Sequence, residues 1–193
     1  MYQAQDYSRL LGMEGLSDQL LNNHFTLYQG YVKNTNTLLE KLDSMLKADQ
    51  VTSPEYAELS RRFGWEFNGM RLHEYYFENI SKTPAAHDAS SPLMQKMVAE
   101  FGSHEMWEKD FRAVGAMRGI GWTVLYYDPQ GDKLLNVWIN EHDVGHLAGC
   151  VPLLVMDVFE HAFMIDYGLK RADYIAAFFK AIDWAVVEKR FAK

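Results

Sequence analysis

Cysteine, positive charge and long hydrophobic runs are all scarce in this chain of 193 residues. The single cysteine, Cys150, excludes a disulfide framework and a zinc site built from cysteines. Asp and Glu outnumber Lys and Arg by 26 to 19, and a net charge of −7 argues against nucleic-acid binding, which needs a cationic surface. No run reaches the roughly 18 apolar residues of a membrane span, and the N-terminal segment lacks the pattern of a signal peptide. We therefore expect a soluble, cytoplasmic protein with no nucleic-acid or membrane partner.

One stretch divides the chain. Small and polar residues with two prolines replace the periodic pattern at residues 81–92. This composition predicts a boundary between an N-terminal helical hairpin domain, residues 1–82, and a C-terminal α+β domain, residues 92–193.

The N-terminal part has the pattern of two long helices. Apolar residues recur at helical spacing after Ser17, a predicted N-cap, and again after Ser53 and Pro54, a cap followed by proline at the first helical position. Because the linking segment is short, the two helices should pack antiparallel with their apolar stripes in contact. Each stripe carries one histidine, His24 in the first helix and His73 in the second.

The C-terminal part mixes helices and strands. Residues 92–101, 104–117 and 172–191 have helical patterns. Two β-rich runs, residues 122–127 and 133–139, flank a turn sequence and predict a hairpin, and the apolar run at residues 151–156 could supply a third strand. The predicted fold class is α+β: an N-terminal two-helix antiparallel hairpin, then a small three-stranded antiparallel sheet flanked by helices.

Four residues have the types and positions of a metal site. A lone histidine on an apolar stripe is usually a core residue, but two on facing stripes could converge. Asp157 and His161 lie four residues apart after an apolar run, although that spacing alone equally fits a helix cap and a packed histidine. With His24 and His73 they make a set of three nitrogens and one oxygen, which suits Fe, Mn or Zn. These residues leave both redox and hydrolytic chemistry open.

The chain resembles the iron/manganese superoxide dismutase family over nearly its whole length. The most specific stretch is MDVFEHAFMIDYGLKRADYIAAFFKAIDW, which is similar to the C-terminal signature of the family. Three further segments are similar to its Gly-x-Gly-Trp hairpin, its second helix and its first helix: GIGWTVLYYDPQGDKLLNVW, FNGMRLHEYYF and NNHFTLYQGYVKNTN. The resemblance implies one Fe or Mn ion per chain, with a slight preference for Fe, bound by His24, His73, Asp157 and His161.

The first helix departs from the family pattern by one residue. The family places its active-site tyrosine eight residues after the ligand, whereas Tyr31 lies seven after His24. Rigid alignment on Tyr31 would put Asn23 at the ligand position. Both offsets leave the tyrosine near the same helix face, so we keep His24 as the ligand and Tyr31 as the proton-relaying residue.

Other roles follow from the resemblance alone. Gly69 stands where typical iron enzymes carry the glutamine that orients solvent at the metal, and His142 lies in the segment that supplies this residue in manganese enzymes, so we assign that role to His142. Further candidates are placed beside the ligands or at the dimer gateway, namely Tyr28, Trp122 and Glu160, and in a cationic substrate funnel, namely Lys170 and Arg171. The signature tryptophans are replaced by Phe77, Val124 and Phe159, while His87, His104 and His146 receive no role.

The function that the resemblance implies is disproportionation of superoxide to dioxygen and hydrogen peroxide. The superoxide anion would be the substrate, and a homodimer the assembly, with a tetramer as its alternative. Two other functions stay open at this point. One is a degenerate member of the fold with a binding or structural role, and the other is a different mononuclear non-haem iron enzyme.

Overall fold

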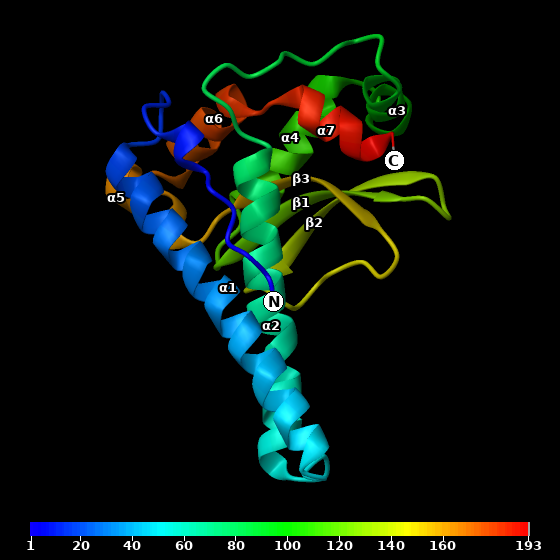
Figure 1. The fold of residues 1–193 in the computed structure, drawn as a ribbon. Helices are drawn as coiled ribbons and strands as arrows, with labels where there is room; N and C mark the ends of the chain where they lie inside the picture. The colour runs from blue at the N-terminus through cyan, green and yellow to red at the C-terminus, as the bar shows by residue number, and fades with distance from the viewer. Residues whose placement is uncertain (193) are drawn as a thin grey trace.

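A computed structural model describes residues 1–192, in which two long helices project from a body built around a three-stranded sheet (Figure 1). No helix in this range combines the length and the apolar character that crossing a membrane requires. The helices and strands, in chain order, are η1 (Ser8–Leu10), α1 (Asp18–Lys47), α2 (Pro54–Glu78), α3 (Pro92–Phe101), α4 (His104–Gly115), β1 (Gly121–Asp128), β2 (Lys133–Asn140), β3 (Val151–Asp157), η2 (Glu160–Ala162), α5 (Met164–Tyr167), α6 (Arg171–Ala181) and α7 (Trp184–Phe191).

The helices α1 and α2 form the predicted antiparallel hairpin. The Ser17 hydroxyl accepts a hydrogen bond from the backbone N–H of Leu20, and the Ser53 hydroxyl caps α2 in the same way, so both predicted starts are confirmed. Leu27, which has the helical spacing of the apolar residues in α1, is nevertheless exposed, because its neighbour Tyr28 takes the inward position of that turn.

The sheet has the strand order β2-β1-β3 and is antiparallel throughout, which confirms the prediction. Strand β1 pairs with β2 from Gly121 opposite Asn140 onward. On its other side, β1 places Trp122 opposite Asp157 of β3, and a bulge shifts the register between Leu125 and Tyr126. The central strand thus brings a tryptophan beside the aspartate of the predicted site.

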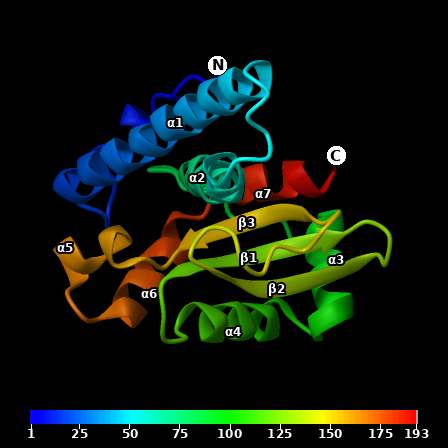
Figure 2. The same ribbon diagram turned by 90° about the horizontal axis from the view of Figure 1, so that it is seen from below.

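The sheet lies between helical layers (Figure 2). Helices α2 and α7 pack on β3, and α4 packs on the other face against β1 and β2. The helix predicted over residues 172–191 is in fact two helices, α6 and α7. The chain extends between them because Ile182 forms a β-bridge with Ile80, just beyond α2.

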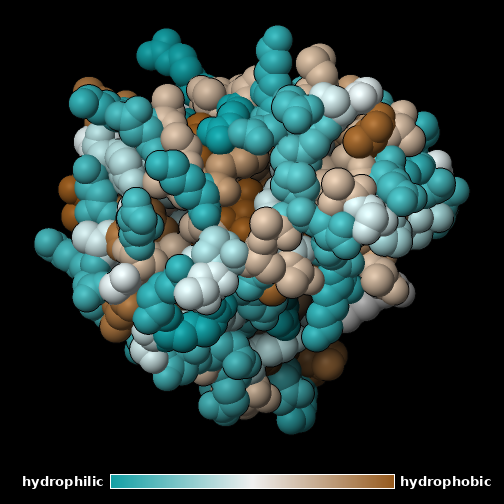
Figure 3. Space-filling model, turned by 90° about the horizontal axis from the view of Figure 1, so that it is seen from above, coloured by the Kyte–Doolittle hydropathy of each residue, from teal (hydrophilic) through white to brown (hydrophobic). Residues whose placement is uncertain are grey.

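The surface is mainly polar on the face seen from above, where hydrophobic residues lie in separate small patches (Figure 3). Among the exposed apolar side chains, Met164, Ile165 and Leu169 follow one another closely in α5 and the turn after it. Leu169 is 91% exposed.

Candidate metal centre

Four side chains from four elements converge where the helical hairpin meets the sheet. They are His24 of α1, His73 of α2, Asp157 at the end of β3 and His161 of η2, and one potential ligand atom of each lies within 4.8 Å of all the others. The Asp157 Oδ2 atom is 3.1 Å from the Nε2 atoms of both His24 and His161, and 3.7 Å from the Nε2 atom of His73. The structure therefore brings together all four residues that the sequence predicts as ligands.

The hydrogen bonds around this cluster leave room for a cation. The Nδ1–H group of His73 donates to the carbonyl oxygen of Gly69 at 2.5 Å, so His73 Nε2 carries a lone pair. That nitrogen is buried, has no hydrogen-bond partner and faces an anionic carboxylate oxygen. Two buried acceptors that face each other are unfavourable unless a cation lies between them. A donor set of three imidazoles and one carboxylate fits Fe, Mn or Zn.

Burial sets the protonation of the ligands. Desolvation lowers the pKa of His24 and lowers that of His73 further below its ordinary value, so both imidazoles are neutral at pH 7. Burial alone would raise the pKa of Asp157, but the adjacent His161 and His24 hold it well below its usual range. Neutral imidazoles and an ionised carboxylate are the forms that bind a metal ion.

The one-residue offset in α1 is absorbed by helix geometry. His24 is fully buried in the cluster, whereas Asn23 is exposed. Seven residues are nearly two helical turns, so Tyr31 lies on the same face, with its ring stacked at 5.2 Å on the ring of His73. The structure thus places both His24 and Tyr31 at the site.

A chain of hydrogen bonds runs beside the ligands from Trp122 to Tyr31. Trp122 Nε1–H donates to His142 Nδ1 at 3.0 Å, and an indole nitrogen can only donate. His142 Nδ1 is therefore unprotonated, and its Nε2–H group donates to the Tyr31 hydroxyl at 2.8 Å. Burial lowers the pKa of His142 to about 4, which keeps this ring neutral. The Tyr31 hydroxyl accepts this bond and has its own proton left to donate.

Gly69 makes room for Tyr31. A Cβ atom at position 69 would lie 2.6 Å from Cδ1 of the Tyr31 ring, far inside contact distance. The ring of Tyr31 thus occupies the space into which a side chain at this position would extend. This packing explains physically why a small residue at position 69 accompanies the Tyr31–His142 hydrogen bond in this chain.

Two phenylalanines pack against the site at positions where the family signature has tryptophan. The ring of Phe159 stacks against those of His142 and His161, at 4.7 and 5.2 Å. Phe77 lies edge-on to His24 at 4.9 Å. The site keeps an apolar wall with smaller rings, which favours neutral imidazoles over charged ones.

Some predicted residues form no hydrogen bond with the ligand cluster. Tyr28 is fully buried, and its hydroxyl bonds Glu74 and the backbone N–H of Gln5 instead of facing solvent. The guanidinium of Arg171 donates to two backbone carbonyls in the loop before β1.

Glu160 and Lys170 have exposed side chains. Glu160 directly precedes His161 in η2, and Lys170 immediately precedes α6. Neither side chain is buried against the ligands, so a role for either residue would have to be exerted from the protein surface.

Two site neighbours have no part in the sequence-based prediction. The ring of Trp65 lies 4.5 Å from that of His142 and 5.5 Å from that of Tyr31, and its Nε1–H group donates to Glu141. The guanidinium of Arg62 lies 3.7 Å from the Trp65 ring centroid. The sequence spacing could have indicated Trp65, because Trp65 precedes His73 by eight residues, two steps of four, and so lies toward the same helix face.

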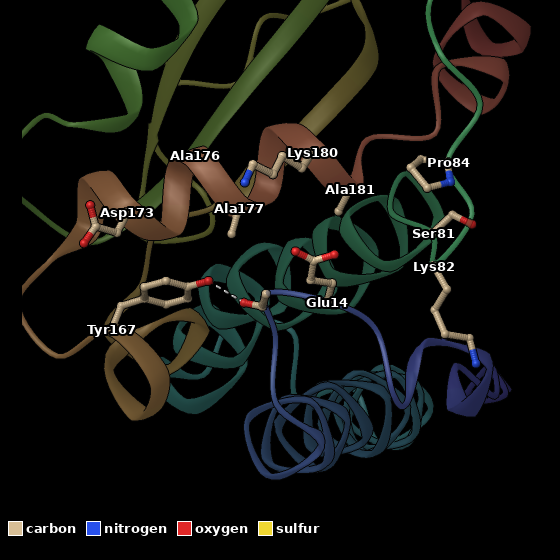
Figure 4. Close-up of a pocket in the computed structure, with 11 residues that line it drawn as sticks. Glu14, Ser81, Lys82, Pro84, Tyr167, Asp173, Ala176, Ala177, Lys180 and Ala181 are labelled. Atoms are coloured by element: carbon tan, nitrogen blue, oxygen red, sulfur yellow. Dashed lines mark hydrogen bonds between the residues drawn. The ribbon is translucent and has the colours of Figure 1, made fainter.

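A cavity of considerable size lies elsewhere (Figure 4). Its volume is about 530 Å³, and its lining comes from α5, α6, the segment before α1 and the chain after α2. Figure 4 shows Tyr167 and Asp173 at one end of it and Lys82 at the other. None of the predicted site residues lines this cavity.

Comparison with known proteins shows one consistent similarity. A family model described as iron/manganese superoxide dismutases, C-terminal domain, matches residues 89–190. A superoxide dismutase [Fe] of Aquifex pyrophilus is 34% identical over 99% of this chain and 91% of that protein. A superoxide dismutase [Mn] 2 of Haloferax volcanii is 35% identical over 88% of this chain and 83% of that protein.

Proposed function

This chain belongs to the iron/manganese superoxide dismutase family, and from that membership we propose that it disproportionates superoxide to dioxygen and hydrogen peroxide. We assign the metal to His24, His73, Asp157 and His161. The observation that supports this most is the convergence of three imidazoles and one carboxylate within 4.8 Å, with two buried nitrogens, His73 Nε2 and His24 Nδ1, left unpartnered. A bound iron or manganese ion would supply the redox chemistry, in which one superoxide loses an electron and a second gains it and leaves with two protons.

The choice of metal stays within the proposal. Relatives named for iron and for manganese are both similar to this chain. We expect one ion per chain, and the slight preference for iron is a prediction from the sequence. The hydrogen bonds around a metal tune its potential, so the geometry at His142 bears on this choice more than the ligand set does.

The side chains beside the ligands would control proton transfer. Burial raises the pKa of Tyr31, so its hydroxyl stays protonated. With His142 Nε2–H donated to its oxygen, the Tyr31 hydroxyl can give its proton toward the ligand cluster and regain one from solvent. His142, whose Nδ1 accepts from Trp122 and whose Nε2–H donates to Tyr31, would orient solvent at the metal through the Tyr31 hydroxyl.

Steering of the anionic substrate has two candidate sources. Lys170 and Arg171 are the pair implied by the family pattern, although Arg171 already bonds backbone carbonyls. Arg62 lies nearer the chemistry, because its positive charge partly offsets the rise that burial causes in the pKa of Tyr31 and adds to the fall that burial causes in the pKa of His142. The first pair is tested by replacing Lys170 and Arg171 together and measuring how the rate depends on salt concentration. An unchanged salt dependence would mean that this pair does not steer the substrate.

Assembly and location also belong to the proposal. The exposed apolar side chains of Met164, Ile165 and Leu169 follow Glu160 and His161 closely, and this segment suits a contact between two copies. We expect a homodimer, with a tetramer as the alternative, and a cytoplasmic location. The oligomeric state is tested by light scattering on the purified protein.

The decisive experiment measures metal content and superoxide turnover on one purified sample. About one iron or manganese ion per chain with fast turnover is the expected result. Turnover that required an organic substrate or 2-oxoglutarate would favour a different non-haem iron enzyme. A folded protein that held no metal, even after reconstitution with either ion, would favour the degenerate alternative.

A further inference from the structure

We propose that His146 is a positioning residue for His142, and that Tyr126 holds His146 in the orientation this requires. The inference rests on the proposed role of His142 at the metal centre. The side chains of Tyr126 and His146 thus form a line from the central strand of the sheet to the backbone of the loop that carries His142.

The loop after β2 needs such support. Asn140 and Val144 close it with two backbone hydrogen bonds of 2.8 and 3.3 Å. Within it, Glu141 adopts a left-handed backbone conformation with φ of 50°, which is unfavourable for a residue with a side chain. His142 therefore lies in a short, strained turn, whose conformation decides where its ring points.

His146 binds the backbone of this turn. Its Nε2 atom is 2.9 Å from the carbonyl oxygen of His142. A carbonyl can only accept, so His146 Nε2 carries the proton and Nδ1 carries a lone pair. That lone pair accepts a hydrogen bond from the Tyr126 hydroxyl group, with 2.8 Å between the oxygen and Nδ1. Both nitrogens of His146 are satisfied, and its tautomer is fixed by its two partners.

Tyr126 is a firm anchor for this line. It lies in β1 directly after the bulge that shifts the pairing with β3, and bulges re-aim side chains. Its side chain is buried, and burial raises its pKa to about 12, so it remains a donor. The central strand of the sheet thereby holds the His142 turn through one imidazole.

The two ends of His142 are consequently held by different groups. Its ring is held by Trp122 and Tyr31, and its carbonyl by His146. Because the line from Tyr126 ends on a carbonyl oxygen, it transmits position and not a proton. Loss of His146 should therefore leave the ligands in place but allow the ring of His142 to move.

A nearby thiol reports on the local structure. Cys150, the only cysteine, lines the same cavity of about 230 Å³ as His146 and Tyr126. Its rate of alkylation measures whether a substitution opens this region. A variant that alters His142 without changing the reactivity of Cys150 has moved a side chain and has not unfolded the loop.

The experiment compares His146→Leu, His146→Gln and Tyr126→Phe with the parent chain. Glutamine can still donate to the His142 carbonyl, whereas leucine fills similar space without a donor. Nitrogen-15 NMR of the metal-free full chain reads the tautomer of His142 and the solvent exchange of its Nε2 proton. This readout needs no catalytic activity, so it fails or succeeds independently of the proposed function.

For His146→Leu we expect exchange of the His142 Nε2 proton to rise about tenfold and, after metal loading, superoxide turnover to fall about fivefold. His146→Gln should restore both values to within about twofold of the parent, with the alkylation rate of Cys150 unchanged throughout. Tyr126→Phe should give a smaller change in the same direction, and it decides the matter if His146→Leu does not fold. His87→Leu, which replaces an exposed loop histidine, is the matched control.

Two results would overturn the proposal. One is an unchanged His142 signal in both His146→Leu and Tyr126→Phe. The other is an equal disturbance in His146→Leu and His146→Gln, because that would mean the imidazole only fills space.

Discussion

The two ends of the helical hairpin are built from the same pair of helices but have opposite surroundings. At its base, α1 and α2 lie against the sheet, and all of their buried residues fall between Leu20 and Leu38 and between Glu66 and Phe77. At its tip, residues 39–65 project from the body, and none of them is buried (Figure 1). Both predicted ligand histidines of the hairpin lie at the base. The helices alone therefore do not make the site; contact with the sheet and with η2 completes it.

The tip and the base of the hairpin differ in the kinds of side chain that they contain. Apart from Trp65, which contacts Glu141 and His142, the tip has half-buried apolar side chains such as Leu42, Leu59 and Phe63. The base adds polar groups that are costly to bury unless they are partnered. A cation at the ligand cluster would satisfy those groups, so metal binding should stabilise the base and leave the tip unaffected.

The largest effect is expected from His73→Ala, which removes the imidazole whose unpartnered Nε2 atom faces Asp157. Replacement of residues outside the ligand set of a metal site typically costs 10–100-fold, so loss of a ligand should lower superoxide turnover by more than about 100-fold. Metal content measured on the same samples should fall in parallel. His87→Ala, at an exposed histidine, is the control and should keep both values. Normal turnover in His73→Ala would remove this residue from the site.

The next effect compares packing at the two ends of α2. Met70 is fully buried at the base, one turn before His73, and Met70→Ala should lower the free energy of unfolding by about 2–5 kcal/mol. Leu59 is half-buried at the tip, and Leu59→Ala should cost about 1 kcal/mol or less without changing turnover. Urea denaturation measures both values. Equal losses of unfolding free energy in the two variants would mean that the tip is packed as tightly as the base.

The sequence predicts most of the base because its elements are regular. The helix starts at Ser17 and Ser53 rest on local capping chemistry, which neighbouring residues settle. The three strands follow from a turn sequence and apolar runs, and the structure confirms them. The break of the C-terminal helix near Ile182 was not predicted, because it depends on a bridge to Ile80, more than a hundred residues away in sequence.

The predicted site depends on resemblance where spacing alone is ambiguous. Periodicity puts His24 and His73 on apolar stripes but does not show that these stripes face Asp157. The contacts of Trp65 and His146 escape prediction for a similar reason. Each is made with a loop, at Glu141 or at His142, whose course no local pattern specifies.

The stability of the metal-free protein should depend on pH through two histidines at the base of the hairpin. Burial holds the pKa values of His24 and His73 below the ordinary 6.5, so unfolding lets both bind protons more readily. Stability contributed by a lowered pKa is present above pH 6.5 and is lost as the pH falls below it. We expect the urea midpoint to drop between pH 7 and pH 5, with a smaller drop in His73→Gln. An equal midpoint at both pH values would contradict this burial effect.

The smallest effects come from two glycines of α2 that differ only in their surroundings. At Gly64 an added Cβ meets nothing within 4 Å, so Gly64→Ala should raise stability by about 0.5–1 kcal/mol through helix propensity. At Gly69 the same methyl group meets the ring of Tyr31, and overlap of this kind typically costs about 1–3 kcal/mol. Gly69→Ala should therefore have the opposite sign, and it should lower turnover several-fold, because the ring must leave His142.

A second substitution separates these two consequences of Gly69→Ala. The clash is with ring atoms that Phe also has, so adding Tyr31→Phe should not relieve it. Adding Tyr31→Ala removes the ring and should recover the unfolding free energy, while turnover stays low because the hydroxyl that accepts from His142 is gone. Recovery of turnover in that double variant would show that Tyr31 only fills space beside α2. Recovery of stability without turnover is the expected result, because packing and proton delivery then reside in different atoms of the same side chain.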